Sequence, residues 1–180
     1  MRLPVGIYGE MKPMSSKQKK LGQNFEKACV QFARQSASLK MSVEFKTKDT
    51  QQLFGDFAYC SNGKSYRVDC KIEENSIPNF PVEDVQCVKD NSVGWIHHLQ
   101  QCDEIWYAKA SCDAEYKTAT ILDCWKILLP KLKAFPWRSF PRKVCYTGYG
   151  ETVLHVVPLE LLEQKCIAFK MRELNKWLNA

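Results

Sequence analysis

Two aspartates and a lysine, placed on either side of a tight turn, are the residues best suited to chemistry. The segment FGDFAYCSNGKSYRVDCKIEE, residues 54–74, sets Asn62-Gly63 between two runs rich in aromatic and apolar residues. An Asn-Gly pair in this setting predicts a two-residue β-hairpin turn, which fixes the register of both strands. Counting outward from that turn, we expect Asp56 directly opposite Asp69, with Lys71 two residues further along the same face.

Opposed acids on a sheet need an explanation, because like charges on directly paired residues destabilise a β-sheet. One interpretation is an ion cluster on a solvated face, in which Lys71 balances Asp56 and Asp69. The other is a site for Mg²⁺, which binds oxygen ligands, typically one or two carboxylates, and leaves positions for water and phosphate. The ammonium of Lys71 would then orient or deprotonate a metal-bound water. We favour the metal site and keep the ion cluster as the alternative.

A helix is expected from Leu21, because apolar residues recur there at helical spacing. Its apolar stripe consists of Leu21, Phe25, Ala28, Cys29, Phe32 and Ala33. Glu26 lies at the border of this stripe, where a carboxylate can be half buried and still reach a cleft. Glu26 is therefore a candidate third acid of the same site.

The arrangement resembles the PD-(D/E)XK nuclease superfamily, whose core is a helix, a three-stranded antiparallel meander, a helix and a further strand. The match covers roughly residues 20–111, with glycine in place of the proline that usually precedes the first acid. The resemblance implies that Asp56, Asp69 and the backbone carbonyl of Cys70 bind Mg²⁺, for which Mn²⁺ would substitute. It further implies that Lys71 positions the attacking water and that Glu26 binds a second ion or a metal-bound water.

The expected activity is therefore a Mg²⁺-dependent endodeoxyribonuclease that cuts duplex or branched DNA by water attack, with a homodimer as one way to cut both strands. The first alternative is a non-catalytic nucleic-acid-binding or partner-binding module that keeps the fold. The second is the ion cluster, in which the charged side chains only balance one another.

A formal net charge of +6 is consistent with a polyanionic partner. Candidate nucleic-acid contacts fall in the N-terminal segment, in the hairpin and in a loop rich in proline and basic residues. They are Lys17, Lys19, Lys20, Arg67, Arg138, Arg142 and Lys143. Solvated side chains are the alternative for most of them, and for Arg67 the alternative is an ion pair with Asp69.

The predicted fold is α/β (α+β), with a mixed central sheet flanked by helices. Strands are expected at 41–47, in the hairpin, and at 104–111, 116–122 and 152–157; helices are expected across 82–101, across 124–135 and from Pro158 to Trp177. Residues 1–20 are expected to form a basic arm, and 21–180 a single domain with its core at 21–111 and an elaboration at 112–180.

Nine cysteines occur without a Cys-x-x-Cys pair, so we expect reduced and mostly buried thiols rather than disulfides or a zinc ribbon. No apolar run approaches the roughly 18 residues of a membrane span, and the first residues lack the features of a secretory signal. A cytoplasmic protein without a membrane partner is expected. Of the pair His97-His98, one side chain is expected to pack and the other to meet solvent.

Overall fold

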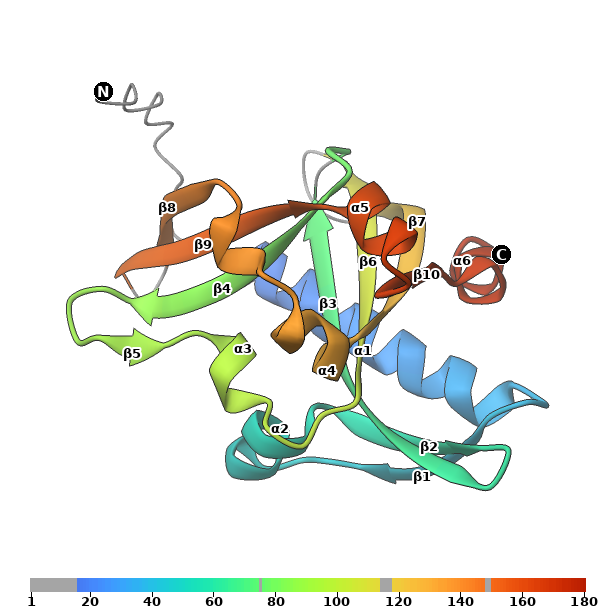
Figure 1. The fold of residues 1–180 in the computed structure, drawn as a ribbon. Helices are drawn as coiled ribbons and strands as arrows, with labels where there is room; N and C mark the ends of the chain where they lie inside the picture. Colours follow the sequence, from blue (N-terminus) through green and yellow to red (C-terminus); the bar gives the residue numbers. More distant parts are fainter. Residues whose placement is uncertain (1–15, 75, 114–117, 148–149) are drawn as a thin grey trace.

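The computed structural model describes residues 16–74, 76–113, 118–147 and 150–180, which form two β-sheets flanked by helices (Figure 1). In chain order, the elements are α1 (Ser16–Gln35), β1 (Lys40–Glu44), α2 (Lys48–Phe54), β2 (Phe57–Ser61), β3 (Lys64–Glu74), β4 (Asn79–Cys87), β5 (Ser92–Val93), α3 (Trp95–His98), β6 (Glu104–Cys112), β7 (Ala119–Leu128), α4 (Leu129–Ala134), the 3₁₀ turn η1 (Trp137–Ser139), β8 (Arg142–Thr147), β9 (Gly150–Pro158), α5 (Leu159–Gln164), β10 (Ala168–Lys170) and α6 (Arg172–Leu178). Within these ranges, no helix combines the length and apolar character needed to cross a lipid bilayer.

The larger sheet is mixed, as predicted, with strand order β1-β2-β3-β6-β7-β10. The strands β3 and β6 are parallel, whereas every other neighbouring pair in this sheet is antiparallel. The α/β fold class is thereby confirmed, and α1 is followed by the expected antiparallel meander β1-β2-β3. Helix α1 begins at Ser16, so the last part of the predicted basic arm is helical, and residues 1–15 of that arm lie outside the described residues.

The hairpin register follows the turn, as predicted, from Ser61↔Lys64 to Phe57↔Val68. Asn62 and Gly63 have φ values of 50° and 74°, which a type I′ turn requires. Pairing then changes at Asp56, whose backbone N–H donates to the carbonyl of Val68 at 2.7 Å. The prediction that Asp56 stands directly opposite Asp69 is therefore wrong by one backbone position.

Strand β6 divides the hydrophobic interior into two cores, because adjacent side chains of a strand point to opposite faces. Trp106 packs toward α1 and α6, against Phe57 and Val68. Tyr107 packs on the other face, in a core that includes Phe80 and Val82 of the smaller sheet and side chains of α4 and α5. Phe57 and Val68, which pair with each other in the hairpin, are both fully buried.

The helix expected across 82–101 is replaced by β4, β5 and the four-residue α3. Strand β4 pairs with β9 in the smaller sheet, whose order is β5-β4-β9-β8. Phe80 and Val82, two residues apart on β4, both point into the core. A register shift between Glu83 and Val85 then interrupts this alternation, so the apolar residues of the segment no longer show the spacing of a strand.

Two other helix predictions are also wrong in part. Residues 124–128 extend β7, and helix α4 begins only at Leu129, with Pro130 in its first turn, where proline is tolerated. The expected C-terminal helix is divided into α5, β10 and α6. Cys166, between α5 and β10, has a φ of 53°, a left-handed conformation that a continuous helix does not contain.

One acidic side chain is a structural part of the core. Glu104, at the start of β6, is 1% exposed and accepts hydrogen bonds from the Tyr59 hydroxyl at 2.9 Å and the Trp106 indole N–H at 3.1 Å. Lys126 Nζ lies 3.6 Å from its other oxygen. Two donors and a cation offset the cost of burying this carboxylate.

All nine cysteines are free thiols. Most are buried, which confirms the expectation that they fill the protein interior, and only one is exposed. The buried thiols are those of Cys29, Cys87, Cys102, Cys124 and Cys145.

Candidate active site

Asp56, Asp69 and Lys71 meet where the pairing of β2 with β3 ends. Oδ2 of Asp56 accepts a hydrogen bond from the backbone N–H of Cys70 at 2.6 Å. At this point of β3, a side-chain carboxylate is therefore the acceptor in place of a backbone carbonyl of the neighbouring strand. Lys71 Nζ lies 2.7 Å from Oδ2 of Asp69, whose residue is 6% exposed. Three of the predicted site residues are therefore brought together by the backbone of one hairpin.

Gly55 makes this arrangement possible. It ends helix α2 with a φ of 90°, a conformation that favours glycine and that the proline ring forbids. A Cβ at this position would lie 2.5 Å from the carbonyl oxygen of Val68. The chain can therefore turn from α2 into β2 and deliver Asp56 to β3 only with glycine here.

The two aspartates oppose each other electrostatically. Burial and then the charge of Asp69 raise the pKa of Asp56 to about 8, against the opposing effects of Lys71 and of the Cys70 N–H. Burial disfavours the ammonium of Lys71, yet Asp69 and Asp56 outweigh this effect and raise its pKa. At neutral pH the metal-free site therefore holds a charged lysine, and its Asp56 carboxyl is largely protonated.

Glu26 lies on α1, half buried, within electrostatic reach of the pair. Burial raises the pKa of Glu26, and the negative charges of Glu44 and Asp69 raise it further. The positive charges of Lys27 and Lys71 act in the opposite direction. The predicted third acid is thus near enough to add negative charge to the site.

The oxygen atoms present fit a magnesium ion. Oδ2 of Asp69 is buried and, apart from the ion pair with Lys71, no described donor reaches it in hydrogen-bond geometry. The N–H and C=O groups of one strand residue point to the same side, so the Cys70 carbonyl points toward Asp56. In the described ranges, no three His, Cys, Asp or Glu side chains gather at metal-binding distance. The oxygens that could bind a cation here belong to two carboxylates and a carbonyl; Mg²⁺ typically takes one or two carboxylates and keeps several waters.

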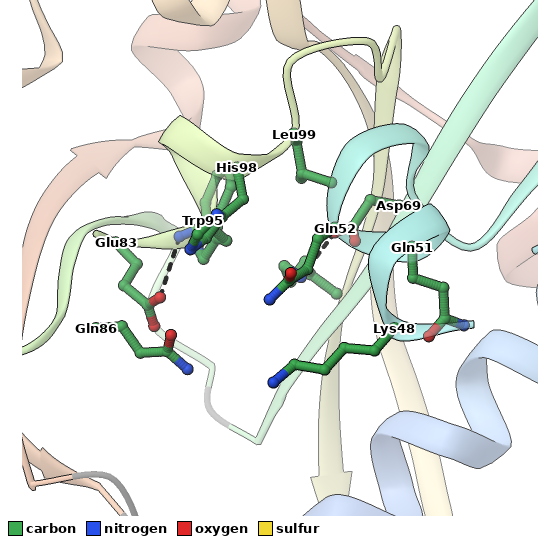
Figure 2. Close-up of a pocket in the computed structure, with 10 residues that line it drawn as sticks. Lys48, Gln51, Gln52, Asp69, Glu83, Gln86, Trp95, His98 and Leu99 are labelled. Carbon is green, nitrogen blue, oxygen red and sulfur yellow. Dashed lines mark hydrogen bonds and ion pairs between the residues drawn. The ribbon is translucent and has the colours of Figure 1, made fainter. Parts of the chain in front are cut away.

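A cavity of about 230 Å³ opens beside this cluster (Figure 2). It is lined by Lys48, Gln51, Gln52, Asp69, Lys71, Glu83, Gln86, Trp95, His98 and Leu99. Glu83 accepts a hydrogen bond from the Trp95 backbone N–H at 3.1 Å, and burial raises its pKa against the effects of that bond and of Lys71. Lys71 Nζ lies 5.6 Å from the centre of the Trp95 ring.

Sequence patterns do not predict that Glu83 and Trp95 lie beside Lys71. The residues that bring them there are in β4 and α3, which were expected to form one helix. Gly94 fixes their approach, because a Cβ there would lie 2.1 Å from the carbonyl oxygen of Glu83. The glycine between two apolar segments is the signal that the sequence offers, and it is equally compatible with an interrupted helix.

Arg67 is not the partner of Asp69. Its Nε lies 3.0 Å from Oδ2 of Asp103, and its Nη1 donates to Gln101 at 3.1 Å. The guanidinium also lies 5.9 Å from the centre of the Phe54 ring. Arg67 therefore links the hairpin to the segment before β6, which leaves it less available for a phosphate than expected.

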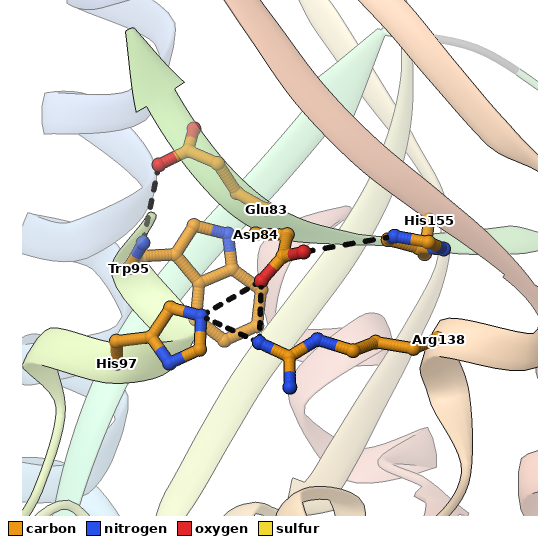
Figure 3. A network of polar contacts seen from close by, with 6 residues as sticks. All are labelled: Glu83, Asp84, Trp95, His97, Arg138 and His155. Atoms are coloured by element: carbon orange, nitrogen blue, oxygen red, sulfur yellow. Dashed lines mark hydrogen bonds and ion pairs between the residues drawn. The ribbon is translucent and has the colours of Figure 1, made fainter. Parts of the chain in front are cut away.

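Arg138 belongs to a polar network around Asp84 (Figure 3). Both Arg138 Nη2 and His97 Nε2 lie 2.8 Å from Oδ1 of Asp84, and His155 Nε2 lies 3.8 Å from its Oδ2. Burial raises the pKa of Asp84, but hydrogen bonds from Arg138 and His97 outweigh it and lower the pKa. The network joins β4, α3, η1 and β9, and the Arg138 guanidinium is already paired with Asp84.

The two neighbouring histidines differ from the prediction, because neither is simply packed or solvated. Both are half buried; His97 binds Asp84, and His98 lines the cavity.

The remaining basic candidates lie on the surface. Arg142 and Lys143 are exposed on β8, and Lys19 and Lys20 are exposed on α1. Lys17 belongs to the same helix, but its side chain lies outside the described part of the structure. These residues are spread over two different elements, so they do not by themselves define one nucleic-acid-binding face.

Comparison of the chain with protein-family models, with curated proteins and with solved structures finds no match.

Proposed function

We propose that this protein is a Mg²⁺-dependent endonuclease that hydrolyses phosphodiester bonds of DNA. The observation that carries the proposal is the meeting of Asp69, buried on β3, with the half-buried Asp56, which directly precedes β2, and with the Lys71 ammonium 2.7 Å from Asp69. The charge of Asp69 raises the pKa of Asp56, so the two acids are poorly placed for stability alone. A divalent cation would offset their repulsion and give the arrangement a use.

Each residue has a definite role in this proposal. Asp56, Asp69 and the Cys70 carbonyl would hold Mg²⁺, or Mn²⁺ in its place, and the bound ion would activate a water and stabilise charge on the phosphate. Lys71, whose pKa is raised, stays protonated and therefore donates to the water or to a phosphate oxygen instead of accepting a proton. Glu26 would hold a second ion or orient water.

Features outside the site are consistent with the same proposal. The exposed Arg142 and Lys143 supply positive charge for a DNA backbone. Free thiols throughout the chain suit a reducing, cytoplasmic environment. Two copies of the chain would present two sites to the two strands of a duplex.

The alternative function is a nucleic-acid-binding or partner-binding module without catalysis. It is favoured by the ion pair of Lys71 with Asp69, which already supplies a cation to the site, and by the absence of a third close acid among the described residues. This alternative predicts DNA binding that does not depend on Mg²⁺.

A cleavage assay distinguishes the two functions. Purified protein is incubated with supercoiled plasmid and with branched DNA in Mg²⁺, in Mn²⁺ and in chelator, beside Asp69→Asn. We expect metal-dependent nicking or linearisation that the variant loses while it still binds DNA in a gel shift. Binding without cleavage under every metal condition would favour the binding module instead.

A further inference from the structure

The cavity beside Lys71 has a composition that neither metal binding nor phosphate binding requires. Its volume of about 230 Å³ is below the roughly 300–1,000 Å³ of pockets that hold drug-sized ligands, so its occupant is small. Besides the acids and lysines, the lining contains an aromatic ring, an aliphatic side chain and several side-chain amides. This mixture suits a flat, partly apolar group with hydrogen-bonding edges.

Trp95 provides a surface on which such a group can stack. The ring is held by Phe80, whose ring centre lies 5.9 Å away in an edge-to-face arrangement. Lys71 Nζ lies 5.6 Å from the Trp95 ring centre and 2.7 Å from Oδ2 of Asp69. The same ammonium lies over the Trp95 ring and against the candidate metal ligand, so a base that stacked on Trp95 in its place would sit next to the reacting phosphate.

Polar side chains surround the same space. Figure 2 shows Lys48 and Gln52 reaching into it from α2, opposite Glu83 and Gln86 of β4. Among the described residues, no hydrogen bond engages the side-chain amides of Gln52 or Gln86. Amides and a carboxylate are the groups that recognise the donors and acceptors at the edge of a nucleobase.

We propose that this cavity binds the base of an unpaired nucleotide next to the scissile phosphate. A base within a duplex is stacked and paired and cannot enter such a pocket without being extruded. The substrate would therefore be single-stranded, gapped or branched DNA rather than a continuous duplex. The inference rests on the proposed function for its account of the phosphate, but the binding of the base can be tested without catalysis.

The test compares two forked DNAs that carry the same number of phosphates. One has normal nucleotides in its unpaired arm, and the other has abasic sugars there, so electrostatic attraction cancels between them. Affinities are measured by fluorescence anisotropy in chelator, where no cleavage occurs. Stacking of a base on an aromatic side chain contributes substantially to the free energy of binding. We therefore expect the wild type to bind the normal fork roughly tenfold more tightly than the abasic fork.

Variants assign the effect to one ring. Trp95→Leu should abolish the tenfold difference, whereas Trp95→Phe, which keeps an aromatic surface, should retain most of it. Trp177→Leu is the matched control, because Trp177 lies on α6 and does not line the cavity. The centre of its ring lies 5.9 Å from that of Phe32. Thermal unfolding of each variant establishes that it is folded before binding is compared.

Two results would overturn the inference: equal affinity of wild type for both forks, or an undiminished difference in folded Trp95→Leu. Cleavage of the normal fork in Mg²⁺, measured in parallel, separates this outcome from failure of the proposed function. Cleavage without a base-dependent gain in affinity would rule out the base-binding pocket but leave the proposed nuclease activity standing. A base-dependent gain without cleavage would keep the pocket as the binding site of a non-catalytic module.

Discussion

Replacing Asp56 by Asn should change how the stability of the metal-free protein depends on pH. In the folded state, burial and the charge of Asp69 raise the pKa of Asp56 from 3.8 to about 8. Between these two values, the folded protein keeps a proton that the unfolded chain has released. The free energy of unfolding therefore falls as the pH rises from about 4 to about 8, and no further loss from this group occurs above that range.

The size of the effect follows from the shift. Each pKa unit corresponds to about 1.4 kcal/mol, so a shift of this extent lowers the stability of the wild type by up to roughly 5 kcal/mol between pH 4 and pH 8. Asn at position 56 has no proton to lose and avoids this penalty. Asp56→Asn should thus be increasingly more stable than the wild type as the pH rises.

Urea unfolding in chelator, followed by tryptophan fluorescence from pH 4 to pH 9, measures the difference. Asp49→Asn is the matched control, since Asp49 is exposed in the first turn of α2 and its loss should leave the profile parallel to that of the wild type. Added Mg²⁺ should then stabilise the wild type at pH 8 but not Asp56→Asn. Parallel profiles for wild type and Asp56→Asn would refute the reasoning, because they would show that Asp56 titrates normally.

Three further predictions concern the same site and its support. Mg²⁺ binding at pH 7 should release about one proton from Asp56, so its calorimetric enthalpy should vary with the ionisation enthalpy of the buffer; identical heats in all buffers would contradict this. Gly55→Ala should lower the free energy of unfolding in urea by roughly 3 kcal/mol and abolish cleavage. Gly22→Ala inside α1, where nothing lies within 4 Å, should instead raise the free energy of unfolding by about 0.5–1 kcal/mol. Similar effects of both changes would be inconsistent with strain at Gly55. Glu104→Ala should lower the free energy of unfolding by roughly 2–5 kcal/mol, because two buried donors lose their acceptor, and a loss below 1 kcal/mol in the same assay would show that they find another.

Local rules explain why the central hairpin could be predicted from the sequence. Asn62-Gly63 fixes a turn whose backbone conformation few other residues adopt, and the turn sets the pairing of the next residues. The same rule fails at Asp56, because the path of the chain there is set by α2 and by Gly55, not by the turn. Asp56, Asp69 and Lys71 are nevertheless grouped as predicted. The Asp56 side chain is long enough to reach the backbone of β3 despite the shift of one backbone position.

The second half of the site could not be predicted, because it depends on contacts between distant segments. Glu83 and Trp95 approach Lys71 only because β4 pairs with β9, a strand about 70 residues later in the chain. Their spacing also suits a helix, so the period of apolar residues gave the wrong element. Cys166 illustrates the same limit, because a helical stripe runs through it although its backbone conformation ends the helix.

Crystals grown with Mn²⁺ would test the central claim most directly. Anomalous scattering locates the ion without assumptions about its ligands. The account predicts a peak within coordination distance of Asp56, Asp69 and the Cys70 carbonyl, with Lys71 moved from its ion pair with Asp69 toward the ion-bound water. A hairpin that keeps the Lys71–Asp69 pair and shows no peak at saturating Mn²⁺ would contradict the account and leave a charge cluster in its place.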